Sequence, residues 1–258
     1  MSLTRGGGPL SSPPGPQTVN YALDGPRHRL FLHPFPRRVR AELGGETVLD
    51  TTGAFLLHES NLNPVLYVPA SDVRAGVLHR TDHSTHCPFK GDASYWTLRA
   101  GGEERENAVW GYEEPLEAAA WLDGLVAFYP DKLDAWYDED EPVRGRFRDP
   151  YHRVDTRRSS RAVTVIRGTE VLAASTRAVL LSETGIANRW YLPREDVRVP
   201  LTRSEKVTHC PYKGDATYFD VPGTADAVWS YEAPLDGVTA IAGLVSFVEG
   251  DEVAVQAA

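Results

Sequence analysis

The sequence predicts a mainly β protein made of two tandem, homologous domains of antiparallel strands, each with one short helix. An eleven-residue signature predicts the duplication, because it occurs at residues 85–95 and again at 208–218 with nine identical positions. Short runs of β-branched and aromatic residues between Gly and Pro clusters predict the strands. One stretch in each copy has a helical composition, at 116–122 in the first and around Gly237 in the second.

The strands are expected in the same order in both copies. Each copy opens with a hairpin, since Gly44-Gly45 and the turn at 167–170 separate paired apolar runs. Alternation places Trp229 and Tyr231 on one strand face. The expected strands are 39–43, 47–50, 55–58, 65–68, 94–98, 108–112 and 125–129, then 162–166, 171–173, 179–182, 190–192, 217–221, 227–231 and 244–248.

The similarity between the copies extends beyond the signature and sets the domain boundaries. Residues 56–59 correspond to 180–183, and residues 109–113 correspond to 228–232. Between the copies the chain is first acidic and then basic, which is typical of a solvated connector. We predict a disordered tail at 1–27, a first domain at 28–131, a charged linker at 132–157, a second domain at 158–250 and a tail at 251–258.

The composition excludes several classes of protein. The formal net charge is −9, which disfavours general binding to nucleic-acid phosphates. No apolar run is long enough for a membrane helix, and the Gly-, Pro- and Ser-rich start lacks the apolar core of a secretion signal, so we expect a cytoplasmic protein. Two cysteines are too few for a disulfide scaffold or a Cys-x-x-Cys zinc site.

The signature loop carries most of the reactive groups. Cys87 and Cys210 occupy the same place in each copy, and a cysteine near a histidine and a lysine can act as a nucleophile. Lys90 and Lys213 can bind an anion or form a Schiff base. The structural alternative is a buried, inert cysteine and a lysine that merely pairs with Asp92.

Two carboxylates recur in half-apolar, strand-like surroundings. They are Glu59 with its counterpart Glu183, and Glu113 with its counterpart Glu232. Such surroundings raise the pKa of a carboxyl group and suit it to acid–base chemistry. The alternatives are exposed strand ends or partners for the loop lysine.

The histidines before the cysteines, His86 and His209, are candidate ligand-binding residues. Successive strand residues point to opposite faces, so only one member of each His-Cys pair faces a given pocket. A set of His, Cys and Glu would offer metal ligands, but the spacing is not typical of a metal site, and we predict none.

Both copies are rich in Tyr and Trp near this loop. Aromatic residues usually form the core, but Tyr and Trp beside a Lys and a Glu also make a pocket for a flat organic ring. We expect the Trp side chains to be mainly core and the Tyr side chains to be divided between the two roles. The candidates are Tyr67, Tyr95, Trp110 and Tyr112 in the first copy and Tyr191, Tyr218, Trp229 and Tyr231 in the second.

The loop at 210–214 resembles that of a known family, the domain of unknown function 427, found in bacteria and fungi in one or two copies per chain. Segments 180–185, 190–197, 229–232 and 149–154 carry the same resemblance. The resemblance implies a β-tent-like fold, in which two small antiparallel sheets meet at an angle. The family is also labelled nucleotidyltransferase-like. Other β-tent proteins bind small ligands in aromatic pockets and often hold zinc on Cys-x-x-Cys knuckles, which this sequence lacks.

Our main hypothesis is a protein that binds or processes a small molecule in each copy. The pocket would be bounded by the signature loop and the Trp-x-Tyr-Glu strand. In it the lysine would bind an anionic or carbonyl group, the glutamate would act as a base or orient the ligand, and the aromatic rings would stack on a ring of the ligand. One alternative is a non-catalytic interaction module whose loop holds the fold. Another is nucleotidyl transfer, which requires a metal held by carboxylates, and the notable Asp-x-Asp pair is Asp138 with Asp140.

The expected partners follow from these hypotheses. We expect a small-molecule ligand and packing of the two copies on each other, without nucleic acid or membrane. The sequence identifies no cofactor.

Overall fold

Antiparallel strands form nearly all the regular structure of the chain, and the mainly β prediction is confirmed. The computed structural model describes residues 3–15, 18, 20, 22, 24–250 and 252–258. The chain forms two units, Met1–Asp149 and Pro150–Ala258, which are described separately below. No helix within the described residues is both long enough and apolar enough to span a bilayer.

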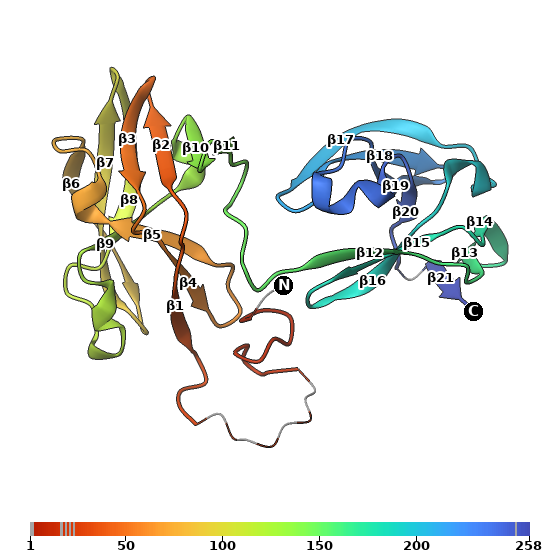
Figure 1. The fold of residues 1–258 in the computed structure, drawn as a ribbon, viewed down its shortest axis with the longest axis horizontal. Coiled ribbons are helices and arrows are strands. Elements are labelled where there is room, and N and C mark those ends of the chain that lie inside the picture. The colour runs from red at the N-terminus through yellow and green to blue at the C-terminus, as the bar shows by residue number, and fades with distance from the viewer. Residues whose placement is uncertain (1–2, 16–17, 19, 21, 23, 251) are drawn as a thin grey trace. The chain divides into compact units, whose positions relative to one another are not determined.

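The first unit contains one long sheet and one small sheet (Figure 1). In the long sheet seven strands follow the order β1-β4-β5-β9-β8-β7-β6, and in the small sheet four follow the order β11-β10-β2-β3. The strands are β1 (Leu30–Pro34), β2 (Val39–Leu43), β3 (Glu46–Thr51), β4 (Phe55–Glu59), β5 (Val65–Pro69), β6 (Leu78–Cys87), β7 (Gly91–Ala100), β8 (Glu103–Gly111), β9 (Leu125–Phe128), β10 (Ala135–Asp138) and β11 (Glu141–Pro142).

The second unit repeats this plan. Its long sheet is divided into β12-β15-β16 and β17-β18-β19-β20, which are joined by a bridge between Leu192 and Val245, and its small sheet is β14-β13-β21. The strands are β12 (Val154–Arg158), β13 (Val163–Arg167), β14 (Glu170–Ser175), β15 (Val179–Glu183), β16 (Ile186–Tyr191), β17 (Thr202–Cys210), β18 (Gly214–Val221), β19 (Thr224–Tyr231), β20 (Val245–Phe247) and β21 (Val253–Ala257).

The helical segments are short and of the 3₁₀ type. The expected helix at 116–122 is η2 (Glu117–Leu122), and its second copy is η5 (Asp236–Ile241). Each is interrupted by a residue with non-helical backbone angles, Ala119 in η2 and Val238 in η5, so neither forms a continuous helix. The remaining single turns are η1 (Ala70–Asp72), η3 (Pro130–Lys132) and η4 (Arg194–Asp196), so each copy has more than the one helix expected.

Strands are present in segments that were expected to be connectors. The expected linker, 132–157, contains β10, β11 and the start of β12, and the expected tail, 251–258, contains β21. β10 pairs with β2 in the first unit, as β21 pairs with β13 in the second. Both strands are short, and they form where backbone pairing with a neighbouring strand of the small sheet is available.

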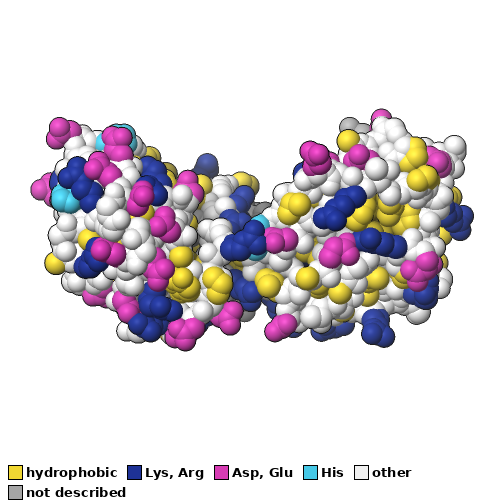
Figure 2. Space-filling model, turned by 90° about the horizontal axis from the view of Figure 1, so that it is seen from above, with side chains coloured by type: hydrophobic (Ala, Val, Ile, Leu, Met, Phe, Trp, Pro, Cys, Tyr) yellow, Lys and Arg dark blue, Asp and Glu magenta, His cyan; other side chains and the backbone are white. Residues whose placement is uncertain are grey.

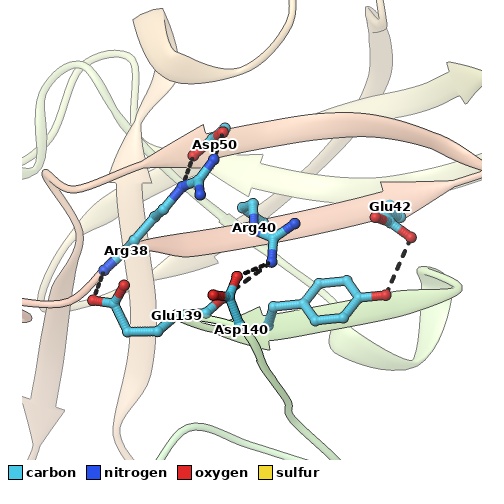
Figure 3. A network of polar contacts seen from close by, with 7 residues as sticks. Arg38, Arg40, Glu42, Asp50, Glu139 and Asp140 are labelled. Atoms are coloured by element: carbon cyan, nitrogen blue, oxygen red, sulfur yellow. Dashed lines mark hydrogen bonds and ion pairs between the residues drawn. The ribbon is translucent and has the colours of Figure 1, made fainter.

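Polar contacts fasten the β10 segment to the small sheet of the first unit (Figure 3). Arg37 Nε donates to Asp138 at 2.6 Å, and Arg40 Nη2 donates to Asp140 at 2.9 Å. The amide of Arg38 donates to the Glu139 carboxylate at 2.9 Å. The acidic residues that suggested a solvated linker therefore bind the arginines on and before β2.

Part of the expected N-terminal tail is also ordered. Residues 3–15 form a series of hydrogen-bonded turns, and Thr4 and Ser11 within them are buried. Residues 1–2, 16–17, 19, 21 and 23 of the same expected tail lie outside the described residues. Gly6 and Gly7 adopt positive φ angles of 59° and 80°, which allow the chain to turn back on itself.

Each unit has two separate hydrophobic clusters. In the first unit the larger cluster lies between the two sheets and includes Leu43, Leu49, Leu98 and Trp136. The smaller one lies around the signature loop and includes Tyr67. The second unit has the same two clusters. The signature residues thus have a core of their own, apart from the one that joins the sheets.

We predict that Trp136 is part of the first unit's core although it was assigned to the linker. Its ring packs at right angles to those of Phe128 and Phe147, with centroids 5.5 and 5.7 Å away. Trp136→Ala is expected to lower the free energy of unfolding by about 3–5 kcal/mol. The matched control Trp121→Ala removes a ring that is 40% exposed and should cost far less. Equal shifts of the two variants in urea denaturation would contradict this assignment.

Candidate functional site

The loop lysine and the glutamate at the end of β4 form a buried ion pair. Nζ of Lys90 donates a hydrogen bond to Oε2 of Glu59, and the two side chains are 9% and 8% exposed. Lys90 does not pair with Asp92, which was the structural alternative. Asp92 bonds to His86 instead. Two of the residues selected from the sequence are therefore brought together directly.

A histidine that the sequence analysis missed completes this cluster. Nε2 of His28 lies 2.8 Å from the second carboxylate oxygen of Glu59. The imidazole is stacked almost parallel on the ring of Phe89, with centroids 3.7 Å apart and an interplanar angle of 10°. Glu59 is thus held between a lysine on one oxygen and a histidine on the other.

The second copy reproduces the cluster. Oε2 of Glu183 accepts from Nζ of Lys213, and Oε1 lies 2.9 Å from Nε2 of His152. The ring of Tyr212 packs on that of His152 with centroids 4.3 Å apart. We call each set of histidine, glutamate and lysine the His–Glu–Lys cluster.

Local backbone geometry positions all three side chains. β1 pairs with β4 so that Leu30 lies opposite Glu59, which brings the preceding His28 to the carboxylate. Lys90 lies in the tight β6–β7 turn, where its amide donates to Cys87 O at 3.2 Å. Gly91 follows with a φ of 103°, a conformation that L side chains rarely adopt, so the turn requires glycine.

The aromatic candidates surround the cluster from the core side. Tyr67, Tyr95 and Tyr112 are buried in the same small core, with Cys87 and Trp110 packed against it. In the equivalent core of the second copy Tyr191 and Tyr231 are buried and Tyr218 is partly buried, and Trp229 Nε1 donates to Tyr191 OH at 3.0 Å. Cys210 is packed against this core and, like Cys87, is a free thiol.

These aromatic side chains fill the interior. Nζ of Lys90 lies 5.8 Å from the centroid of the Tyr112 ring, within the range of a cation–π contact. Burial raises the pKa of the Tyr67 and Tyr112 phenols far above the usual range for tyrosine. Both phenols therefore remain protonated and do not act as bases. The rings that were expected to be divided between core and pocket therefore act mainly as the wall behind the cluster.

The other candidates of the first copy lie away from the cluster. His86 alternates with Cys87 along β6 and so faces the opposite side, where it pairs with Asp92 at 2.6 Å. Glu113 accepts from Arg80 Nε at 3.0 Å. Both pairs are exposed, so the His, Cys and Glu set considered as metal ligands is not assembled.

The same separation is found in the second copy. His209 pairs with Asp215 at 2.7 Å, and Glu232 pairs with Arg194. Neither contact involves Glu183 or Lys213. Four of the residues selected from the sequence, two in each copy, therefore lie on the outer face of the β hairpin.

A surface depression lies apart from both clusters. That depression, of about 270 Å³, lies over β13 and β14 and includes Arg177 and Asp196 in its lining. It contains no member of either His–Glu–Lys cluster. At the first cluster Phe89 is 40% exposed and the His28 side chain 21%, whereas the His152 side chain of the second cluster is 7% exposed.

The electrostatics of the cluster are clearest at Glu183. Burial by itself would raise the pKa of this carboxyl group, but the hydrogen bond from His152 and the charge and hydrogen bond of Lys213 outweigh it and lower the pKa to about 2. The carboxylate remains ionised, and it orients Nε2 of the imidazole.

A signal for the missed histidines was present in the sequence. Both copies contain Pro-x-His-Arg, at 26–29 and at 150–153. In each copy the histidine precedes its glutamate by 31 residues. The first occurrence spans the boundary predicted between the tail and the first domain, and the second lies in the predicted linker.

The low pKa of Glu183 predicts an acid-dependent contribution to stability. Its ordinary pKa is 4.5 and its folded value about 2, so the contribution is complete above pH 4.5 and is lost as the pH falls through 2. The difference in unfolding free energy between the wild type and Glu183→Gln should therefore shrink by on the order of 3 kcal/mol between these pH values. Chemical denaturation at several pH values measures it, and a constant difference would contradict it.

We also predict strong coupling within the first cluster. Glu59→Gln or Lys90→Met alone leaves one buried charge without its partner and should cost about 3–5 kcal/mol. The double variant removes both charges and should cost less than the sum of the single variants by at least about 1.5 kcal/mol. Additive costs in a double-mutant cycle would show that the two side chains do not depend on each other.

Comparison with known proteins agrees with this duplicated geometry. A search of curated proteins returned no match. A family described as a domain of unknown function, DUF427, matches residues 31–139 and again 155–257. The two matches cover the paired sheets of each unit, together with Glu59, Lys90 and their counterparts. The chain is therefore a member of the DUF427 family with two copies of its domain.

Proposed function

We propose that each copy binds a small molecule with an anionic or carbonyl group at its His–Glu–Lys cluster and that the histidine exchanges a proton with it. The observation that carries this proposal is the occurrence of the same buried cluster in both copies. A buried ion pair is a poor way to gain stability, because desolvation offsets most of the attraction. Its presence in both copies is better explained by chemistry than by folding.

The three side chains have separate roles in this proposal. Glu59 accepts from Lys90 on one carboxylate oxygen and contacts His28 with the other, so it orients the imidazole. His28 is the group at the rim and meets the ligand, with Phe89 as a flat apolar surface beside it. Cys87 is a free, partly buried thiol packed against the small core around the signature loop.

The nucleotidyl-transfer alternative has weaker support. It requires carboxylates that are available to a metal ion. Asp138 instead forms an ion pair with Arg37, and Asp140 forms one with Arg40 (Figure 3). These aspartates serve to attach β10, and no observation favours them as a catalytic pair.

The surface supports a small-molecule partner in preference to nucleic acid. On the face shown in Figure 2, Lys and Arg side chains are interspersed with Asp and Glu on both units. A backbone-binding protein instead needs a continuous basic surface. We propose that the small molecule is the partner and that each copy binds one.

A thermal-shift measurement tests the proposal. The full-length protein would be screened against inorganic phosphate, pyruvate, benzoate, AMP and divalent metal salts. A compound that binds only the native state stabilises it by about 2.7 kcal/mol at a hundredfold excess over its dissociation constant. We expect a shift that is lost when both clusters are neutralised, by Glu59→Gln with Lys90→Met and by Glu183→Gln with Lys213→Met.

The matched control neutralises an exposed pair instead. Arg80→Met with Glu113→Gln removes the same two kinds of charge on the outer face of the hairpin and should leave the shift unchanged. His28→Gln with His152→Gln should weaken binding while leaving both ion pairs in place. If no probe shifts the folded wild type, or if the cluster variants keep the shift, the non-catalytic interaction module becomes the better explanation.

A further inference from the structure

The turn after the cluster glutamate differs between the copies at one informative position. Asn61 and Gly185 are each the second residue after their glutamate, and both have a φ of 69°. Glycine adopts this left-handed conformation freely, whereas an asparagine pays a steric cost for it. The first copy therefore carries an asparagine side chain at a position whose backbone conformation favours glycine.

The amide of Asn61 binds the backbone of the N-terminal segment. Its Oδ1 accepts from the Ser12 amide at 3.1 Å, and its Nδ2 donates to the Ser12 carbonyl at 2.8 Å. Its own backbone amide donates to Thr4 O at 2.8 Å. One asparagine thus satisfies both the amide and the carbonyl of Ser12 and fixes a second point of the same segment at Thr4.

The neighbouring serine links this segment to the cluster. Ser60 Oγ donates to Leu10 O at 2.6 Å and accepts from the Arg29 amide at 2.9 Å. Arg29 follows His28, and Ser60 follows Glu59. The contact therefore lies next to two of the three cluster residues. Thr184 makes the equivalent bond to the Arg153 amide, at 2.9 Å.

The segment has a folded shape that suits this contact. Within it the Gly8 amide donates to Arg5 O at 3.0 Å, and the Leu10 amide donates to Leu3 O at 3.1 Å. Thr4 is 0% and Ser11 1% exposed. Such burial and internal bonding are typical of a docked element and not of a solvated tail.

We propose that residues 3–13 are an intramolecular strap, that Asn61 is the residue that binds it, and that the strap holds Glu59 and His28 of the first copy together. Gly185 has no side chain, so the equivalent turn of the second copy cannot form the two amide bonds. The surface formed by Ser60 and Asn61 thus has a committed occupant, the N-terminal segment of this chain. The effect on ligand binding rests on the proposed function, whereas the strap itself does not.

Hydrogen–deuterium exchange of the full-length protein tests the strap without a ligand. Asn61→Gly gives the first copy the residue of the second, so the turn is preserved and only the amide is lost. We expect the amides of residues 5–12 to exchange at least about tenfold faster in this variant, since two hydrogen bonds are removed. Gly185→Asn is the matched control and should leave their exchange unchanged.

A further variant separates the amide from the turn. Asn61→Asp keeps the acceptor for the Ser12 amide and loses the donor to its carbonyl, so the exchange rate should be intermediate. Rapid exchange of residues 5–12 already in the wild type, or an unchanged rate in Asn61→Gly, would overturn the proposal.

The effect of the strap on ligand binding at the first site is measured in a variant whose second cluster is neutralised by Glu183→Gln with Lys213→Met. In that background, any probe that binds the wild type should bind Asn61→Gly about three- to tenfold more weakly, because the release of Ser60 and Asn61 loosens Glu59. Loss of exchange protection without a change in affinity would retain the strap and reject its role at the site. Absence of binding in both proteins, with the exchange difference intact, would count against the proposed function alone.

Discussion

Each copy depends on a buried ion pair between the lysine of the signature loop and the glutamate at the end of β4 or β15. It connects two points far apart in the chain, the end of β4 or β15 and the tight turn before β7 or β18. Because each charge is costly to bury alone, the pair can exist only if both strands and the turn are in place. The histidine and the aromatic wall then take their positions around a carboxylate that is already fixed.

The duplication makes each copy a comparison for the other. What both share is the His–Glu–Lys cluster, the tyrosines behind it and the ring that packs on the histidine. The copies differ near the rim of the site: Phe89 of the first corresponds to Tyr212 of the second, and Asn61 corresponds to Gly185. The copies therefore share the interior of the site and differ at its rim.

The sequence predicted the fold class well because strand alternation, turn glycines and the internal repeat are local signals. It also predicted the pairing partners Glu59 and Lys90 as members of one site. It did not separate them from His86 and Glu113, because residues close in sequence on a strand can face opposite sides. It missed His28, whose part in the site depends on a strand pairing across 31 residues.

By itself the sequence determined the two copies, their strands and the residues that the signature loop contributes, since each of these is written in local composition and spacing. Tertiary structure alone decided which charges meet, which rings are buried and that the N-terminal segment docks on the first copy. Those outcomes depend on antiparallel register and on the free energy of burying a charge with its partner, and neither is encoded in a short stretch of chain.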